Sequence, residues 1–251
     1  MLNQFMRYLP LSRLVKDERS ERVLEVGSGA RGLSRYLPGQ AIVGVDINFK
    51  ETAAAATGLF TPVKGSALKL PFDNGSFPVV VCSDVLEHIA AEDRETAISE
   101  LWRVAGRKVF LSFPVNESHG WWERLLLKTY KALKTPVPDW LEEHAANGLP
   151  NEADVTGFLR RSRMPFTAVP NENNLVHFLV MLAEMTILCG YLNYISDILA
   201  PDTWEKAGRS RKANLVRAIF KPLRRLPEAL SFGSTVRKIF IIDKEGAAAV
   251  H

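Results

Sequence analysis

Apolar and polar residues alternate in blocks along the first half of the chain, and these blocks predict strands and helices in turn. The run at residues 79–82 is apolar throughout, as is typical of a buried central strand. The predicted strands are residues 22–26, 41–45, 61–64, 79–82 and 108–113, and the predicted helices are residues 32–37, 51–57 and 92–104. Strands and helices that alternate in this order indicate a parallel sheet with right-handed crossovers.

The second half of the chain is less regular. Residues 114–150 contain a tryptophan pair, two proline-bounded turns and a helical patch, and a helix at 153–163 and a strand at 166–169 follow. Residues 175–199 form a long, mostly apolar helical stretch, and a last strand is predicted at 236–242. Together with a lead-in helix at the N-terminus that covers the sheet edge, these elements predict one large α/β domain with additions.

The net charge of +4 is unevenly distributed, because basic residues without any intervening acid fill the stretch between Glu205 and Glu228. They are Lys206, Arg209, Arg211, Lys212, Arg217, Lys221, Arg224 and Arg225. Cys82 and Cys189 lie far apart in apolar surroundings, which favours two buried thiols in a reducing cytosol over a disulfide. No metal-ligand spacing and no signal-peptide pattern is present, so we expect a cytoplasmic protein without a metal.

The segment VLEVGSGARG, residues 23–32, predicts a strand followed by a glycine-rich turn. Gly27, Gly29 and Gly32 let the backbone turn tightly and let a ligand approach the main-chain amides. Asp46 ends the second predicted strand, where its carboxylate can accept both hydroxyls of an adenosine ribose. These features fit NAD, FAD and S-adenosylmethionine alike.

Glu25, in the strand before the glycine turn, separates these cofactors. A dinucleotide would place an anionic pyrophosphate over the turn, where a carboxylate would repel it. S-adenosylmethionine instead carries a cationic sulfonium and a cationic ammonium, which a nearby carboxylate favours. A solvated strand-end charge is the alternative for Glu25, but a carboxylate between Leu24 and Val26 in a core strand is costly without a role.

These segments resemble class I S-adenosylmethionine-dependent methyltransferases, in particular the group that includes the ubiquinone- and menaquinone-type enzymes. VLEVGSGARG is similar to their first motif, VGVDIN to their second, and GSALKLPFDNGSFPVVVCSDVLEHI to a longer block that ends in V-L-E-H. The resemblance implies a Rossmann-like seven-stranded mixed sheet with helices on both faces and a helical insert before the last strand. It implies a cofactor site formed by Glu25, Gly27, Ser28, Gly29, Gly32, Asp46, Ile47, Ser66, Ala67, Leu68, Asp84 and Val85.

The resemblance also assigns a part of the cofactor to each segment. The glycine turn takes the methionine part, Asp46 takes the ribose, Ile47 and residues 66–68 border the adenine, and Asp84 with Val85 lies underneath.

Two residues depart from the family pattern. Ser66 replaces the usual aspartate that accepts from the adenine amino group, and a hydroxyl is a weaker acceptor than a carboxylate. Pro78 replaces the aspartate that usually precedes the fourth strand. We therefore expect a cofactor site with weaker selection for adenine.

Methyl transfer can proceed by positioning and desolvation, so the sequence need not display a catalytic residue. A base is needed only if the acceptor must lose a proton, and His119 and His144 are the candidates that we favour over His88. His119 follows the fifth predicted strand beside Trp121 and Trp122, which form an apolar pocket wall or pack in the core. His144 belongs to H-x-x-x-G-L-P, which is similar to lid segments of related methyltransferases, whereas a structural helix-start role is the alternative for His88.

The domain organisation follows from the placement of the last two strands. Residues 1–169 and 236–245 form the S-adenosylmethionine-binding domain, with 114–152 as a lid over the acceptor site. Residues 170–235 form a helical insert, apolar in its first half and basic in its second. The basic part, 206–227, fits an anionic membrane surface, with a solvated face packed on the domain as the alternative.

The sequence thus predicts methyl transfer from S-adenosylmethionine to a small or lipid-linked hydrophobic acceptor, at the inner face of the membrane. A non-catalytic S-adenosylmethionine-binding adaptor is the alternative function. Nucleic acid is a disfavoured partner, because Phe220 is the single aromatic residue interleaved with the basic ones. Glu25 and the V-L-E-H block also disfavour a nicotinamide oxidoreductase.

Overall fold

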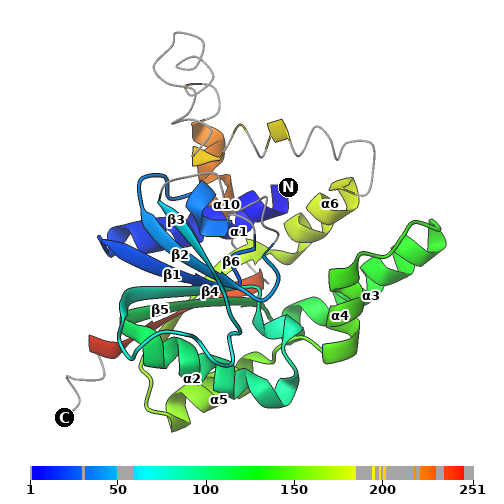
Figure 1. Cartoon of the computed structure of the whole chain (residues 1–251). Coiled ribbons are helices and arrows are strands. Elements are labelled where there is room, and N and C mark those ends of the chain that lie inside the picture. Colours follow the sequence, from blue (N-terminus) through cyan, green and yellow to red (C-terminus); the bar gives the residue numbers. More distant parts are fainter. Residues whose placement is uncertain are drawn as a thin grey trace.

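A seven-stranded sheet with the order β3-β2-β1-β4-β5-β7-β6 forms the centre of the molecule (Figure 1). The computed structural model describes residues 2–29, 32–49, 59–184, 194–195, 198, 200–201, 218, 221–229 and 235–245. The strands are β1 Arg22–Val26, β2 Ala41–Asp46, β3 Phe60–Lys64, β4 Phe77–Ser83, β5 Ala105–Pro114, β6 Phe166–Asn173 and β7 Thr235–Asp243. Strands β1 to β5 run parallel, and β7 runs antiparallel between β5 and β6. The predicted seven-stranded mixed sheet is therefore confirmed.

Helices lie on both faces of this sheet (Figure 1). They are α1 Leu2–Asp17, α2 Arg94–Val104, α3 Asn116–Ala132, α4 Asp139–Asn147, α5 Glu152–Arg161, α6 Asn174–Glu184 and α10 Leu226–Ala229. The short 3₁₀ turns are η1 Gly32–Arg35, η3 Leu86–His88, η4 Ala91–Asp93 and η5 Pro222–Arg225. The helix predicted at 32–37 is thus a single 3₁₀ turn, and the helix predicted at 51–57 lies outside the described residues.

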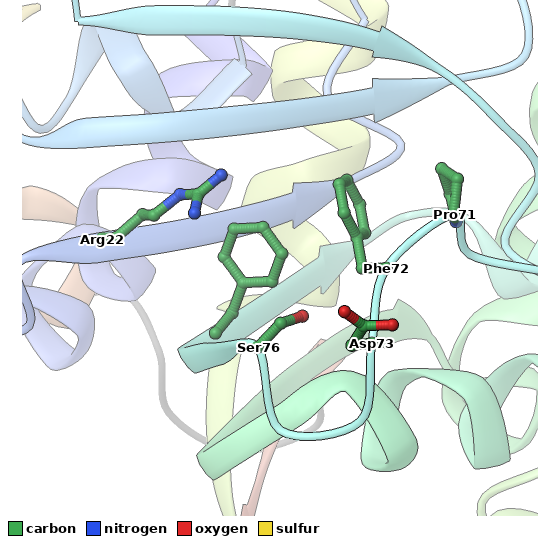
Figure 2. Close-up of a pocket in the computed structure, with 6 residues that line it drawn as sticks. Arg22, Pro71, Phe72, Asp73 and Ser76 are labelled. Carbon is green, nitrogen blue, oxygen red and sulfur yellow. The ribbon is translucent and has the colours of Figure 1, made fainter.

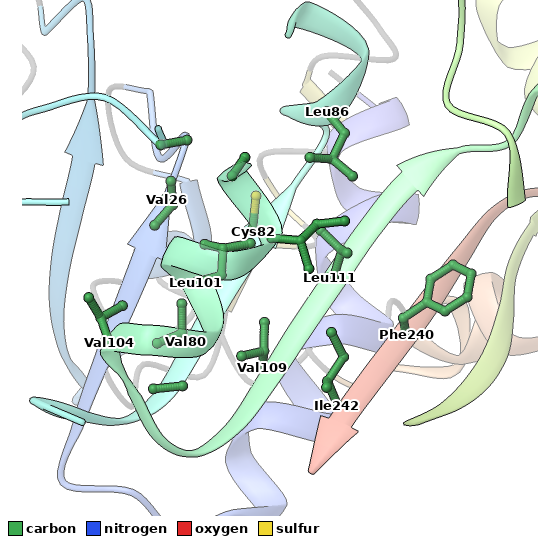
Figure 3. Close-up of a cluster of buried hydrophobic side chains, with 14 of the residues drawn as sticks. Val26, Val80, Cys82, Leu86, Leu101, Val104, Val109, Leu111, Phe240 and Ile242 are labelled. Carbon is green, nitrogen blue, oxygen red and sulfur yellow. The ribbon is translucent and has the colours of Figure 1, made fainter. Parts of the chain in front are cut away.

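One face of the sheet carries an apolar layer that continues from strand to strand. Leu24, Val80, Val109 and Ile242 are register partners across β1, β4, β5 and β7, so their side chains share a face. They pack with Leu101 of α2 in a buried cluster that also includes residues of α5 (Figure 3). This layer holds the four strands in a fixed register and thereby fixes where their carboxyl ends lie.

The opposite face is covered by α1. Its apolar side chains are buried together with Val23, Val79 and Phe110, which point to this face of β1, β4 and β5. The buried residues of the helix are Phe5, Met6, Tyr8, Leu9, Leu11 and Val15. The expectation that the lead-in helix covers the sheet edge is therefore wrong, because so broad an apolar stripe requires a whole face.

Helices α3, α4 and α6 form a helical cap with a small apolar core of its own. Leu126 and Tyr130 of α3 pack there with Leu141 of α4 and Met181 of α6. The segment 114–150, expected to be irregular with one helical patch, thus contains two helices. Helix α6 lies in the predicted insert, but most of that insert, including the basic residues 206–217, falls outside the described residues. Among the residues that the structure describes, no helix has the length and apolarity needed to cross a bilayer.

A hollow of about 310 Å³ lies at the amino ends of β1 and β4 (Figure 2). Pro71, Phe72, Asp73 and Ser76 line it, and the Arg22 guanidinium lies 4.6 Å from the centroid of the Phe77 ring. Open α/β sheets bind their ligands at the carboxyl ends of the strands, so we assign no ligand to this hollow.

Candidate active site

A cavity of about 660 Å³, here called the strand-end cavity, opens at the carboxyl ends of β1, β2 and β4. Most of the predicted cofactor residues line it. They are Gly27, Gly29, Asp46, Ile47, Ser66, Ala67, Leu68, Asp84 and Val85. His88 of η3 and Glu143 and Asn147 of α4 complete its wall. Glu25, Ser28 and Gly32 do not line the cavity.

The glycine turn and Asp46 hold each other in place by main-chain hydrogen bonds. Gly27 adopts a φ of 77°, a conformation that favours glycine, and its amide donates to the carbonyl of Val45 at 2.8 Å. The amides of Gly29 and Asn48 donate to the two carboxylate oxygens of Asp46, each at 2.9 Å. The carboxylate is thereby fixed at the rim of the cavity.

Glu25 lies beneath the glycine turn instead of at its mouth. Its side chain is buried, and both carboxylate oxygens accept from the amide of Leu33 at 2.9 Å. A Cβ at Gly32 would lie 2.3 Å from Oε1 of Glu25, so the carboxylate occupies the space that a side chain there would need. Burial raises the pKa of Glu25 to about 8. The expected position at the mouth of the turn is thus wrong, because the strand points this side chain into the core.

Asp84 forms part of the cavity wall, but arginines hold its carboxylate. Arg7 of α1 donates to Oδ2 at 2.6 Å, and Arg237 of β7 donates to Oδ1 at 3.0 Å. Burial alone would raise the pKa of Asp84, but the charges of Arg237 and Arg7 outweigh burial and hold this pKa well below its usual range. The backbone of Asp84 has a φ of 53°, in the left-handed region.

Arg237 links Asp84 to further buried charges and so forms an ion-pair network. Arg237 also pairs with Glu172 of β6, whose Oε1 lies 3.0 Å from Nδ1 of His177 in α6. The network thus connects α1, β6, β7 and α6 to the wall of the strand-end cavity. Its members are Arg7, Asp84, Arg237, Glu172 and His177. Each charge depends on its partners, because removing one leaves another buried without compensation.

The segment predicted to border the adenine follows β3 and lines the strand-end cavity. The Ser66 hydroxyl accepts from the amide of Leu68 at 3.2 Å, which orients it at the cavity wall. Ile47 lines the cavity and is 58% exposed, so it offers an open apolar surface. Pro78, the second departure, lies in β4 where the pairing with β5 shifts register between Phe77 and Val79.

The candidate histidines differ in their positions. His88 lines the cavity, and its Nδ1 lies 2.5 Å from Oε2 of Glu143. His144 is buried behind it, with Nδ1 at 2.7 Å from Oε1 of Glu123 and the two imidazole centroids 5.2 Å apart. His119 lies in α3, and its side chain falls outside the described residues. The structure therefore places His88 nearer to the cavity than His144, the reverse of the preference drawn from the sequence.

Several residues at this site carry no sequence signal. Glu123 and Glu143 become partners of histidines only when α3 and α4 fold against η3, and Arg7 and Arg237 lie at opposite ends of the chain. Glu87 stands next to His88 in the V-L-E-H block, and this adjacency was the one indication in the sequence that Glu87 lies near the site.

The matches to known proteins agree with this geometry. Residues 24–113 match a family model described as a methyltransferase domain. An S-adenosylmethionine-dependent methyltransferase from Thermotoga maritima is similar in structure, with 16% identity, 96% of this chain and 91% of that chain covered, and a TM-score of 0.52. A methyltransferase from an antibiotic biosynthesis pathway of Anabaena variabilis has 13% identity, covers 94% of this chain and 98% of its own, and has a TM-score of 0.54.

A third similar structure is phosphoethanolamine N-methyltransferase 2 of Haemonchus contortus, in complex with phosphomonomethylethanolamine and S-adenosylhomocysteine. It is 17% identical, with 90% of this chain and 49% of that chain covered and a TM-score of 0.53, so this chain spans about half its length. Sequence identities of 13–17% show a similarity in fold alone.

The strand order and the similar structures together define a class I methyltransferase fold. Within it, residues 24–113 match a methyltransferase domain, and S-adenosylmethionine is the cofactor that such a domain uses. The narrower ubiquinone- and menaquinone-type group stays a prediction.

Proposed function

We propose that the protein binds S-adenosylmethionine in the strand-end cavity and transfers its methyl group to a small-molecule acceptor that enters beside α4. The observation that carries this proposal is the convergence of three strand-end segments on one cavity. These segments are the glycine turn after β1, Asp46 at the end of β2, and residues 65–68 after β3. Each follows a different parallel strand, so the sheet itself brings them to one edge.

In this proposal each part of the cofactor meets a different segment. The carboxylate of Asp46, fixed by two amides, still has lone pairs to accept the ribose hydroxyls. Ile47 and residues 66–68 border the adenine, and Gly27 and Gly29 leave room for the methionine part. Glu25 acts from beneath the turn, where the cationic groups of the cofactor favour its ionised form.

The acceptor side of the cavity has two layers of histidine. His88 with Glu143 stands at the wall, and His144 with Glu123 stands behind it. Positioning and exclusion of water are sufficient for an acceptor that is already nucleophilic. For an acceptor that must lose a proton, His88 is the nearest candidate base, while His144 and His119 stay candidates from the sequence.

We also propose that the acceptor is hydrophobic or lipid-linked and is reached at an anionic membrane surface. Helix α6 of the insert exposes Leu175 and Leu179, by 54% and 53%. Lys221 and Arg225 at the end of the basic stretch are exposed as well. Exposed apolar and basic side chains in one insert support docking at such a surface.

Calorimetric titration with S-adenosylmethionine tests the cofactor placement. Asp46→Ala should weaken binding at least about 30-fold, because it removes charge-assisted hydrogen bonds to two hydroxyls. Asp73→Ala, at the exposed hollow of Figure 2, is the matched control and should bind as the wild type does. Equal affinity of Asp46→Ala and wild type would refute the placement.

Formation of S-adenosylhomocysteine with a panel of small amines, phenols and quinols tests the transfer. The panel is run with and without vesicles that contain an anionic lipid, and we expect turnover that rises with the vesicles at low salt. Turnover that ignores the vesicles would refute the membrane part. Tight cofactor binding without turnover of any acceptor, including a lipid extract, would favour the adaptor alternative.

A further inference from the structure

Three metal-ligating side chains meet behind the wall of the strand-end cavity. Glu87 and His88 belong to η3, and His144 belongs to α4, which packs against η3. One potential ligand atom from each side chain lies within 4.8 Å of the other two. We call these three residues the Glu-His-His cluster.

Two of these side chains are buried and have an atom without a hydrogen-bond partner in the described structure. Glu87 is 1% exposed, and His144 is 8% exposed. Oε2 of Glu87 and Nε2 of His144 are the partnerless atoms. A buried carboxylate oxygen and a buried imidazole nitrogen without partners are costly, so this arrangement calls for a ligand between them.

Carboxylates orient both imidazoles of the cluster. Glu123 lies at 2.7 Å from Nδ1 of His144, and Glu143 lies at 2.5 Å from Nδ1 of His88. Metal-binding histidines almost always donate from one ring nitrogen to a carboxylate, a backbone carbonyl or a water, and bind the ion through the other nitrogen. With Nδ1 of His144 next to Glu123, its Nε2 is the nitrogen that a cation would reach.

We propose that Glu87, His88 and His144 bind one divalent transition-metal ion, with Zn²⁺ as the best fit. Two imidazoles and one carboxylate are a ligand set of catalytic zinc sites, whereas Mg²⁺ and Ca²⁺ select all-oxygen ligands. Zinc–ligand bonds of about 2.0–2.1 Å place ligand atoms roughly 3.3 Å apart. The ligand atoms lie within 4.8 Å of one another, so side-chain shifts of about an ångström close the site.

Three protein ligands leave one coordination position of the ion open. Because His88 is one of these ligands, the open position can face the strand-end cavity. His88 lines the strand-end cavity, so the ion lies next to the space proposed for the acceptor. An oxygen or sulfur atom of the acceptor would bind at the open position and lose its proton to solvent more readily. That atom then takes the methyl group from the sulfonium, which leaves S-adenosylhomocysteine. This role in the reaction rests on the proposed function, whereas metal binding itself does not.

Zinc titration of the full-length protein, stripped by a chelator and followed by calorimetry and metal analysis, tests the site. We expect one bound equivalent of Zn²⁺, with affinity at least tenfold weaker in His144→Ala and in Glu87→Gln. Glu123→Gln should lower the affinity about 10- to 100-fold, because this residue only orients a ligand. Glu142→Gln, at an exposed position of α4 beside the cluster, is the matched control and should bind Zn²⁺ as the wild type does.

Two further readouts keep the result interpretable. Retained S-adenosylmethionine binding shows that each variant folds, and Co²⁺ should give a visible ligand-field spectrum that His144→Ala loses. Wild-type protein that takes up no more Zn²⁺ than His144→Ala would overturn the proposal, as would Mg²⁺ competing with Zn²⁺ at equal concentration. Because Asp46→Ala should lose the cofactor and keep Zn²⁺, failure of the metal site and failure of the proposed function give different results.

Discussion

The two sides of the strand-end cavity use different kinds of polar group. On the cofactor side, main-chain amides dominate: Gly29 and Asn48 hold Asp46, and Gly27 bonds to the carbonyl of Val45. On the acceptor side, side chains from separate helices dominate, as in the buried pair between His144 of α4 and Glu123 of α3, which lie 21 positions apart.

This difference predicts how each side responds to substitution. A site built from main-chain groups depends on backbone conformation, so it is sensitive at glycines and at the few side chains that brace a turn. A site built from buried charged side chains depends on every partner, because a charge left alone retains its full desolvation cost. The ion-pair network around Arg237 connects the two sides of the cavity. It holds Asp84 in the cavity wall, and it extends through Glu172 to His177 in α6 of the helical cap.

Arg237→Met should give the largest effect. Arg237 is buried and pairs with both Asp84 and Glu172, so its loss removes one counter-charge from each of two buried carboxylates. We expect the free energy of unfolding to fall by about 3–5 kcal/mol, measured by urea denaturation.

Lys238→Met is the control for that measurement. Its ammonium pairs with Glu152 at 2.7 Å in a partly exposed position, so the expected loss is about 1 kcal/mol or less. If Arg237→Met cost no more than Lys238→Met, the network would not join the two sides.

The same contrast explains what the sequence could predict. Strand periodicity and the glycine turn are local signals, so the sheet and the position of Asp46 were predictable, whereas residues 66–68 were placed at the site by the resemblance to the methyltransferase motifs. Arg7 and Asp84 lie 77 positions apart, and no pattern in either segment indicates the other. Their pairing follows from where α1 packs, and that placement was predicted wrongly. The partners of His88 and His144 were unpredictable for the same reason, since the helical cap brings them together.

Glu25→Gln should give the next effect, through the pH dependence of stability. The pKa of Glu25 is about 8 in the folded protein, against an ordinary value of 4.5, because the side chain is buried. Between these values the folded state holds a proton that the unfolded chain has released, so stability falls as pH rises. The loss is at most about 1.4 kcal/mol per pH unit for this group, or roughly 3 kcal/mol between pH 5 and 7.

Urea denaturation at several pH values measures this slope in wild type and in Glu25→Gln. The variant keeps an amide oxygen to accept from Leu33 and lacks the titrating group, so its slope should be flatter by that amount. Parallel slopes in the two proteins would show that Glu25 is ionised throughout this range. In that case the cofactor side would contain a buried charge of the kind found on the acceptor side.

Gly32→Ala should give the smallest effect and tests whether backbone geometry governs the cofactor side. Gly32 has a φ of 38°, and a Cβ there would meet the Glu25 carboxylate at 2.3 Å. Gly39 has a φ of 84° with no heavy atom within 4 Å of such a Cβ, so Gly39→Ala reports the conformational cost alone. We expect unfolding free energies lower by about 2 kcal/mol for Gly32→Ala and by about 1 kcal/mol for Gly39→Ala.

Calorimetry should also show weaker S-adenosylmethionine binding in Gly32→Ala alone, because the new methyl group displaces Glu25 and the glycine turn above it. An equal loss of unfolding free energy in the two variants would mean that the Glu25 side chain moves aside without disturbing the glycine turn. The carboxylate of Glu25 would then not support the cofactor side.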